Sequence, residues 1–235
     1  MDTTTSHVSP EAAQPTAERS LPRRILDTFV APGELFASFG ERPPWFGVLA
    51  ISTLAVVAAL ALLPTELFVA QMREAMQARP DAPRMDVEAM GGFARISGII
   101  GAGFSQFVGS AIVAGVLTLI FRMLMGGSGT FRQHLAVASH SSLIPALGAL
   151  VTLPIQIARG DMGTRLSLAL LAPFLDSDSF VYKILQGLEI FTLWWIAVVA
   201  LGVAVVGRRT SWGTAAATLF GIYLVILMVT AALTS

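Results

Sequence analysis

Residues 187–206 read GLEIFTLWWIAVVALGVAVV, and this stretch contains one charged side chain, that of Glu189. An α-helix rises about 1.5 Å per residue, so about 20 mostly apolar residues cross a hydrocarbon core about 30 Å thick. Four further blocks have the same apolar character, at residues 45–63, 96–124, 135–157 and 214–233. The sequence therefore predicts an all-α fold, a polytopic membrane helix bundle with five transmembrane helices within residues 42–235.

The composition supports a chain that folds in lipid. Hydrophobic residues make up 54% of the sequence and charged residues 13%, with a mean hydropathy of +0.72, whereas about 25% of the residues of a soluble domain are charged. The formal net charge is zero, so we expect no nucleic-acid partner. The absence of cysteine excludes disulfides, thiolate metal sites and cysteine nucleophiles.

The first forty residues divide into two parts. Residues 1–20 are rich in Thr, Ser, Pro and Glu, too polar for a signal peptide, and are predicted to form a disordered tail. Residues 21–41 have an amphipathic pattern that Pro32 and Gly33 break, which predicts two short interfacial helices on the cytoplasmic membrane surface. This segment either anchors the first span at the interface or docks a cytosolic partner. The expected interfacial anchors are Phe29, Leu35, Phe36 and Phe39.

The loops predict the orientation. Residues 122–133 and 207–211 contain arginines and no acidic residue, so the positive-inside rule places them in the cytoplasm together with the N-terminus. The C-terminus is then on the opposite side. The richness in Ala, Arg and Gly favours a bacterial protein, so the expected location is the bacterial cytoplasmic (inner) membrane.

Two segments on the outer side are not expected to be spans. Residues 66–78 are amphipathic and either extend the first span or lie on the outer surface. Residues 166–175 are too short to cross and are expected to form an interfacial or re-entrant helix. A sixth span through this segment, the alternative, would turn the C-terminus inward.

Polar side chains inside the second and third spans form a candidate intramembrane cluster. His140 and Ser141 place polar atoms where an unpaired group is costly, and Gln106 of the preceding span is their expected partner. One interpretation is an interhelical hydrogen bond worth about 0.6 kcal/mol that fixes packing. The other is a wet cavity through which a solute passes.

Small residues predict a helix-packing face on the second span. They recur every four residues, which lets two helices approach closely. We expect this face to pack within the monomer, with self-association into a homo-oligomer as the alternative. The residues are Gly101, Ser105 and Gly109.

No catalytic, cofactor or metal site is predicted, so we expect a protein that is not an enzyme. The spans contain no pair of acidic residues, and a hydrolase or metal site would need such a pair or an activated serine. His134 and His140 do not have the spacing near four of helical zinc ligands. The glycines at 126–129 are followed by no lysine, so we expect a tight turn capped by Thr130 rather than a phosphate loop.

Several stretches resemble the Yip1 domain (YIP1) family of multi-span integral membrane proteins: GGSGTFRQHL at 126–135, ASHSSLIP at 138–145, FTLWW at 191–195 and ALG at 200–202. The resemblance covers roughly Ala31 to Leu233 and implies five spans with a cytoplasmic N-terminus. Eukaryotic members of the family sit in early secretory membranes, bind Rab-type GTPases and are linked to vesicle formation. This chain has only Ala31-Pro32-Gly33 near the place of their Asp-Leu-Tyr-Gly-Pro stretch, so the resemblance does not imply Rab binding.

Two functions follow from these observations. The first is a non-enzymatic scaffold, adaptor or membrane-organising protein, which recruits a protein partner through its cytoplasmic arm. The alternative is a small channel or transporter that uses the polar residues of spans two and three. The expected partners are the lipid bilayer, a protein at the N-terminal arm and a second copy of the chain, with no cofactor.

Overall fold

The computed structural model describes residues 19–77 and 86–234, and within these ranges the chain is helical with no strand. The predicted all-α class is therefore confirmed. The predicted tail falls almost entirely on residues 1–18, outside the described residues. The elements are α1 (Leu21–Val30), α2 (Pro32–Ala37), α3 (Phe46–Leu62), α4 (Thr65–Gln77), α5 (Val87–Leu117), the π-helix η1 (Thr118–Leu124), α6 (Phe131–Ser141), α7 (Leu143–Arg159), the 3₁₀ turn η2 (Leu168–Leu171), α8 (Phe180–Gly187), α9 (Ile190–Gly207) and α10 (Trp212–Thr234).

Four helical segments are long and apolar enough to cross a membrane: Val87–Leu124, Phe131–Arg159, Ile190–Gly207 and Trp212–Leu233. A fifth span is present if α3 and α4 are taken together, although the two helices meet at an angle of 87°. Because of this bend α4 does not continue α3 in a straight line, and it packs along α5 instead. The structure thus has the membrane helix bundle that the sequence predicts, with four to five candidate spans.

The segment 166–175 differs from its prediction. The expected ten-residue helix is replaced by the short turn η2, and the helix that follows it, α8, begins only at Phe180. Backbone hydrogen bonds hold the start of this segment extended against the start of α9, from Leu168 N to Leu188 O and from Ile190 N to Leu166 O. These bonds occupy backbone groups that a helix would use, and Pro173 lacks an N–H to continue one.

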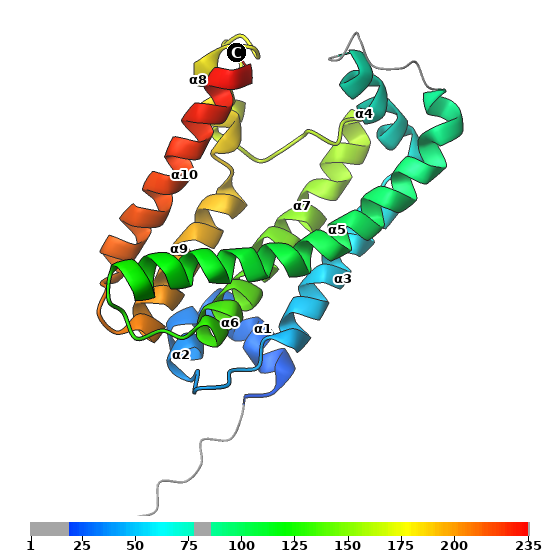
Figure 1. The fold of residues 1–235 in the computed structure, drawn as a ribbon. Coiled ribbons are helices and arrows are strands. Elements are labelled where there is room, and N and C mark those ends of the chain that lie inside the picture. Colours follow the sequence, from blue (N-terminus) through cyan, green and yellow to red (C-terminus); the bar gives the residue numbers. More distant parts are fainter. Residues whose placement is uncertain (1–18, 78–85, 235) are drawn as a thin grey trace, which may run out of the picture.

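The two ends of the bundle carry different elements (Figure 1). The helices α1 and α2 lie at one end together with the turn before α6 and the turn between α9 and α10. The end of α4, the start of α5, the helix α8 and the C-terminal end of α10 lie at the opposite end.

The glycine turn at 126–130 has the structure that the sequence predicts. Gly126 has a φ of 71°, and the hydroxyl of Thr130 accepts a hydrogen bond from the backbone N–H of Gln133 in a capping box. At Gly127 a Cβ atom would lie 2.7 Å from the carbonyl oxygen of Phe121. Both the N–H and the hydroxyl of Ser128 donate to the carbonyl oxygen of Gly207, so this turn is fastened to the end of α9.

Candidate functional site

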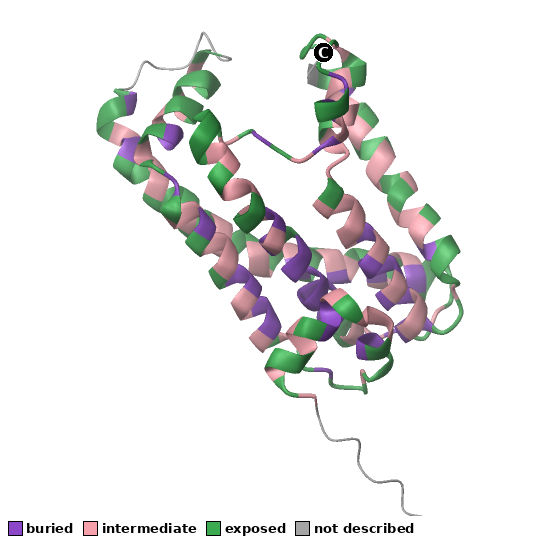
Figure 2. Cartoon of the chain, turned by 180° about the vertical axis from the view of Figure 1, so that it is seen from behind, coloured by how far each residue is buried: buried purple, intermediate pink, exposed green. Residues whose placement is uncertain are grey.

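The centre of the bundle is α6, the most enclosed helix of the described chain. Every residue from His134 to Ser141 is buried, because α1, α3, α5 and α9 all pack against this helix. Figure 2 shows the buried residues gathered in this part of the bundle. A helix in this position is unusual in its chemistry, since it carries two histidines and two serines.

Some polar atoms of this central region are paired. Nδ1 of His140 donates to the carbonyl oxygen of Ala136 at 2.8 Å. The hydroxyl of Ser142 donates to Ser139 O at 2.7 Å and lies 2.7 Å from the hydroxyl of Ser52 on α3. The bond between Ser52 and Ser142 connects α3 to the α6–α7 junction.

Other buried polar atoms of α6 have no hydrogen-bond partner. They are Nε2 of His134, the hydroxyl of Ser139, Nε2 of His140 and the hydroxyl of Ser141. All four side chains are fully enclosed, and an unpaired polar group in such surroundings is destabilising.

The predicted cluster of Gln106, His140 and Ser141 is not assembled as expected. No hydrogen bond joins Gln106 to either residue, and the ring of His140 lies 5.1 Å from that of Phe39 at the end of the N-terminal arm. Gln106 instead lines a hollow of about 130 Å³ on α5, with Ser110 and Ser142 among its neighbours. His140 is instead paired with the carbonyl oxygen of Ala136, and its ring lies beside that of Phe39.

The expected interfacial anchors are found mainly inside the protein. Leu35 is 0% and Phe36 is 1% exposed in the core beside α9, and the ring of Phe29 meets that of Trp194 edge-on. The structure thus replaces lipid contact at Leu35 and Phe36 by protein contact. The part of the amphipathic segment that carries Leu35 and Phe36 therefore faces the bundle.

The buried carboxylate of Asp27 on α1 is paired with two arginines of the N-terminal arm. The carboxylate of Asp27 is 0% exposed, and its oxygens lie 2.6 Å from Arg19 and 2.9 Å from Arg23. Two apolar residues of α1 are nevertheless exposed, Leu26 by 50% and Val30 by 66%. The arm is therefore an ordered surface, attached to the bundle by the packing of α2 on α9 and of α1 on α3, α6 and α7.

The small-residue face of α5 is uncovered. A Cβ atom added at Gly101 or Gly109 would meet nothing within 4 Å, and Ser105 is exposed. Close approaches to α5 occur at other glycines, Gly91 and Gly103, where an added Cβ would meet Val69 and Val57. The expected packing within the monomer thus uses a different face of this helix.

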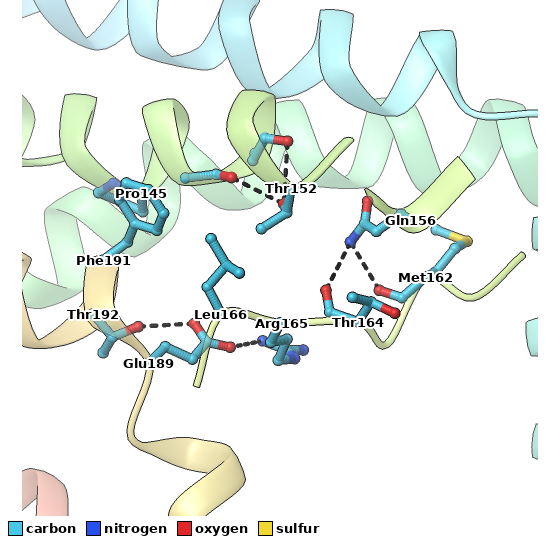
Figure 3. A pocket seen from close by; sticks show the side chains of 12 residues that line it. Pro145, Thr152, Gln156, Met162, Thr164, Arg165, Leu166, Glu189, Phe191 and Thr192 are labelled. Carbon is cyan, nitrogen blue, oxygen red and sulfur yellow. Dashed lines mark hydrogen bonds and ion pairs between the residues drawn. The ribbon is translucent and has the colours of Figure 1, made fainter. Parts of the chain in front are cut away.

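A polar cavity of about 290 Å³ lies between α7, α9 and the segment that precedes η2 (Figure 3). Arg165 donates to Glu189 at 2.7 Å, and the hydroxyl of Thr192 donates to the other carboxylate oxygen. The amide of Gln156 donates to the carbonyl oxygens of Met162 and Thr164. The sequence analysis missed this cavity, because its residues come from segments far apart in the chain. Among the described residues no three His, Asp or Glu side chains are grouped to hold a metal.

Comparison with known proteins agrees with the resemblance seen in the sequence. Residues 26–233 match the Yip1 domain family. The chain is 27% identical over 209 residues to "Membrane protein YknW" of Bacillus subtilis (strain 168), an alignment that covers 86% of this chain and 87% of that protein. No solved structure matches the chain.

Proposed function

We propose that this chain, which belongs to the Yip1 domain family, is a non-enzymatic scaffold of a bacterial inner membrane that recruits a protein partner to its N-terminal helices. The observation that carries this proposal is the docking of α1 and α2. These helices are attached to the bundle by the burial of Leu35 and Phe36 in the core beside α9, yet Leu26 and Val30 of α1 remain exposed. An apolar surface that is already ordered binds a partner at a lower entropic cost than a flexible segment.

The charges around this surface favour a protein partner. Arg23 is 61% exposed and Glu34 75% exposed at the side-chain level, so both signs of charge flank the apolar positions. Interfaces of this kind combine a small apolar centre with a polar rim. An anionic lipid surface would instead favour a mainly basic rim.

We place this end of the molecule in the cytoplasm. It includes the start of α6, which carries Arg132, and the turn between α9 and α10, which carries Arg209, in addition to the arm with its arginines. Basic residues next to span ends are retained inside. The surface of α1 is then offered to soluble or peripheral proteins of the cytoplasm.

The test is crosslinking in native membranes followed by purification of the tagged protein. Leu26→Glu with Val30→Glu changes the exposed face without opening the core, whereas removal of residues 1–40 would also remove Phe36. Arg132→Glu is the control, since Arg132 is exposed at the same end of the molecule.

We expect a crosslinked partner with the wild type and with Arg132→Glu, and its loss with the double variant. All three proteins should insert to equal levels. Recovery of the same partner with the double variant, or of no partner with any protein, contradicts the proposal. Poor insertion of the double variant would assign Leu26 and Val30 to lipid contact and contradict it as well.

A second candidate function is the passage of a small solute, which the polar cavities favour. Pro145 lines both the cavity of about 290 Å³ and the hollow of about 130 Å³ at Gln106. Gln156 and Thr152 line the first and Ser142 lines the second, so polar side chains lie on both sides of Pro145. Flux into proteoliposomes that Gln106→Leu and Thr152→Val abolish, with folding intact, would support this function over the scaffold.

A further inference from the structure

A groove on the lipid-facing side joins two hollows of opposite character. The first is the hollow of about 130 Å³ that contains Gln106, Ser110 and Ser142. The second, of about 190 Å³, lies between α5, α9 and α10 and is lined by Ile112, Leu117, Ile222 and Ile226 among other apolar residues. Val113 and Trp195 line both, so the two hollows are neighbours along α5 and α9, and the surface that contains them is here called the α5–α9 groove.

The polar end of the α5–α9 groove has unused hydrogen-bonding groups. Ser110 is 7% exposed and lines the hollow, and its hydroxyl makes no hydrogen bond in the structure. The amide of Gln106 likewise makes none. Both residues lie near the middle of the segment Val87–Leu124, where hydrocarbon surrounds the protein and no bulk water is at hand to satisfy them.

The apolar end opens sideways to the lipid. Ile112 is 60% and Ile226 53% exposed at its rim, while Leu117 and Val199 are buried at its floor. The only hydroxyl there, that of Tyr223, already donates to the carbonyl oxygen of Gly187. A chain of hydrocarbon therefore fits this part of the groove, whose other lining residues are apolar apart from the indole of Trp195.

The charge of the groove selects the class of ligand. No acidic or basic residue lines either hollow, and a phosphate or ammonium brought to this depth would be unpaired and costly. A hydroxyl group is neutral and both donates and accepts hydrogen bonds, and an ester carbonyl accepts them, so these groups can pair with an amide and a serine hydroxyl.

We propose that the α5–α9 groove binds a neutral, hydroxyl-bearing lipid of the bilayer, with its polar group at Gln106 and Ser110 and its apolar chain between α5 and α10. A diacylglycerol has this chemistry. The inference stands on the geometry of the groove and does not depend on the scaffold function or on the arm.

Trp195 makes the proposal measurable, because it lines both hollows. A protein that keeps Trp195 and carries Trp45→Phe, Trp194→Phe and Trp212→Phe is reconstituted in phosphatidylcholine vesicles. Brominated diacylglycerol and brominated phosphatidylcholine are then compared as fluorescence quenchers at equal bromine content. We expect the diacylglycerol to quench several-fold more strongly and to saturate at a low mole fraction.

Two substitutions and one control locate the site. Gln106→Leu with Ser110→Ala removes the polar end while changing little volume, and should reduce quenching by the diacylglycerol to that by phosphatidylcholine. Ser105→Ala, at an exposed position of the same helix outside both hollows, should leave it unchanged. A single-tryptophan protein that keeps Trp212 instead should be quenched equally by both lipids.

Three outcomes would overturn the proposal. Equal quenching of Trp195 by the two lipids would mean that the polar end holds water only. If the diacylglycerol still quenches the double variant more strongly than phosphatidylcholine does, the lipid binds elsewhere. Quenching that depends on the protein-to-lipid ratio would indicate that a second copy of the chain covers the groove. If the double variant does not fold, Ser110→Ala alone gives the same comparison.

Discussion

The helices α6 and α10 show that burial in this protein does not follow hydropathy. The most apolar window of α10 has a mean hydropathy of 2.3, yet 6% of it is buried. By contrast α6, with two histidines and two serines, is buried at every residue from His134 to Ser141. In water the order would be reversed, because apolar burial drives folding there.

The difference in burial arises because lipid accommodates apolar side chains but not polar ones. Apolar side chains of α10 lose nothing when they face hydrocarbon, so no force draws them inside. Polar groups of α6 are costly in lipid, and the small side chains beside them let other helices come close. The close fit is visible at Gly202 of α9, where a Cβ atom would lie 2.5 Å from Cγ1 of Val137 and 3.1 Å from Phe36.

The largest expected effect is that of the same substitution made on the two helices. Ala136 on α6 is 0% exposed, and Ala217 on α10 is exposed. Ala136→Leu should lower the free energy of unfolding by about 3 kcal/mol through overpacking, while Ala217→Leu should change it by less than about 0.5 kcal/mol. Thermal unfolding in detergent, followed by size-exclusion chromatography, measures both. Equal losses of stability in the two variants would contradict the difference between the two helices.

A second pair of substitutions probes the contact between α9 and α6. Gly202→Ala places a methyl group against Val137 and should cost about 1 to 2 kcal/mol, within the range for overpacked cores. Gly221→Ala on α10 meets nothing within 4 Å and should be neutral or stabilising, since alanine favours the helix over glycine. The two variants should therefore shift the unfolding temperature in opposite directions. A stabilising Gly202→Ala would show that Val137 moves aside.

The sequence predicted the spans better than it predicted their surroundings. Length and hydropathy were sufficient to locate the apolar blocks, and glycine with a following threonine was sufficient to predict the turn before α6. The start of the second helical segment was placed at residue 96, whereas α5 begins at Val87, because its first turns are amphipathic and pack on α4 rather than crossing lipid. The π-helical end at Thr118–Leu124 has no signal in apolar periodicity.

The sequence identified the candidate residues by their chemical type, but it did not predict which residues they contact. Gln106 and His140 were recognised as polar groups inside spans, and both are, yet hydropathy does not tell which neighbour each will have. The amphipathic pattern of α1 and α2 does not distinguish a lipid surface from a protein surface, because both are apolar. Only the arrangement of α9 beside Phe36 separates the two.

Two hydroxyl groups of the enclosed region, those of Ser52 and Ser141, should contribute differently to stability. Ser52→Ala removes the contact with Ser142 and should cost about 0.6 kcal/mol, the average for such bonds between membrane helices. Ser141→Ala removes a hydroxyl that has no partner, so its effect should be zero or slightly stabilising. Unfolding temperatures of the two variants test this difference in sign. A clear loss with Ser141→Ala would mean that a bound water pairs with its hydroxyl.

The smallest effect on stability is expected on the uncovered face of α5. Gly109→Leu adds a large side chain where nothing lies within 4 Å, so the monomer should unfold at nearly the same temperature as the wild type. The same substitution would block close approach of a second copy along Gly101, Ser105 and Gly109. Light scattering in detergent measures whether this substitution changes the size of the particle. It therefore tests whether Gly109 serves contact between two copies of the chain, as Gly202 serves packing within the monomer. A smaller particle with unchanged thermal stability would assign the face to self-association, whereas an unchanged particle would leave it in contact with lipid, as α10 is.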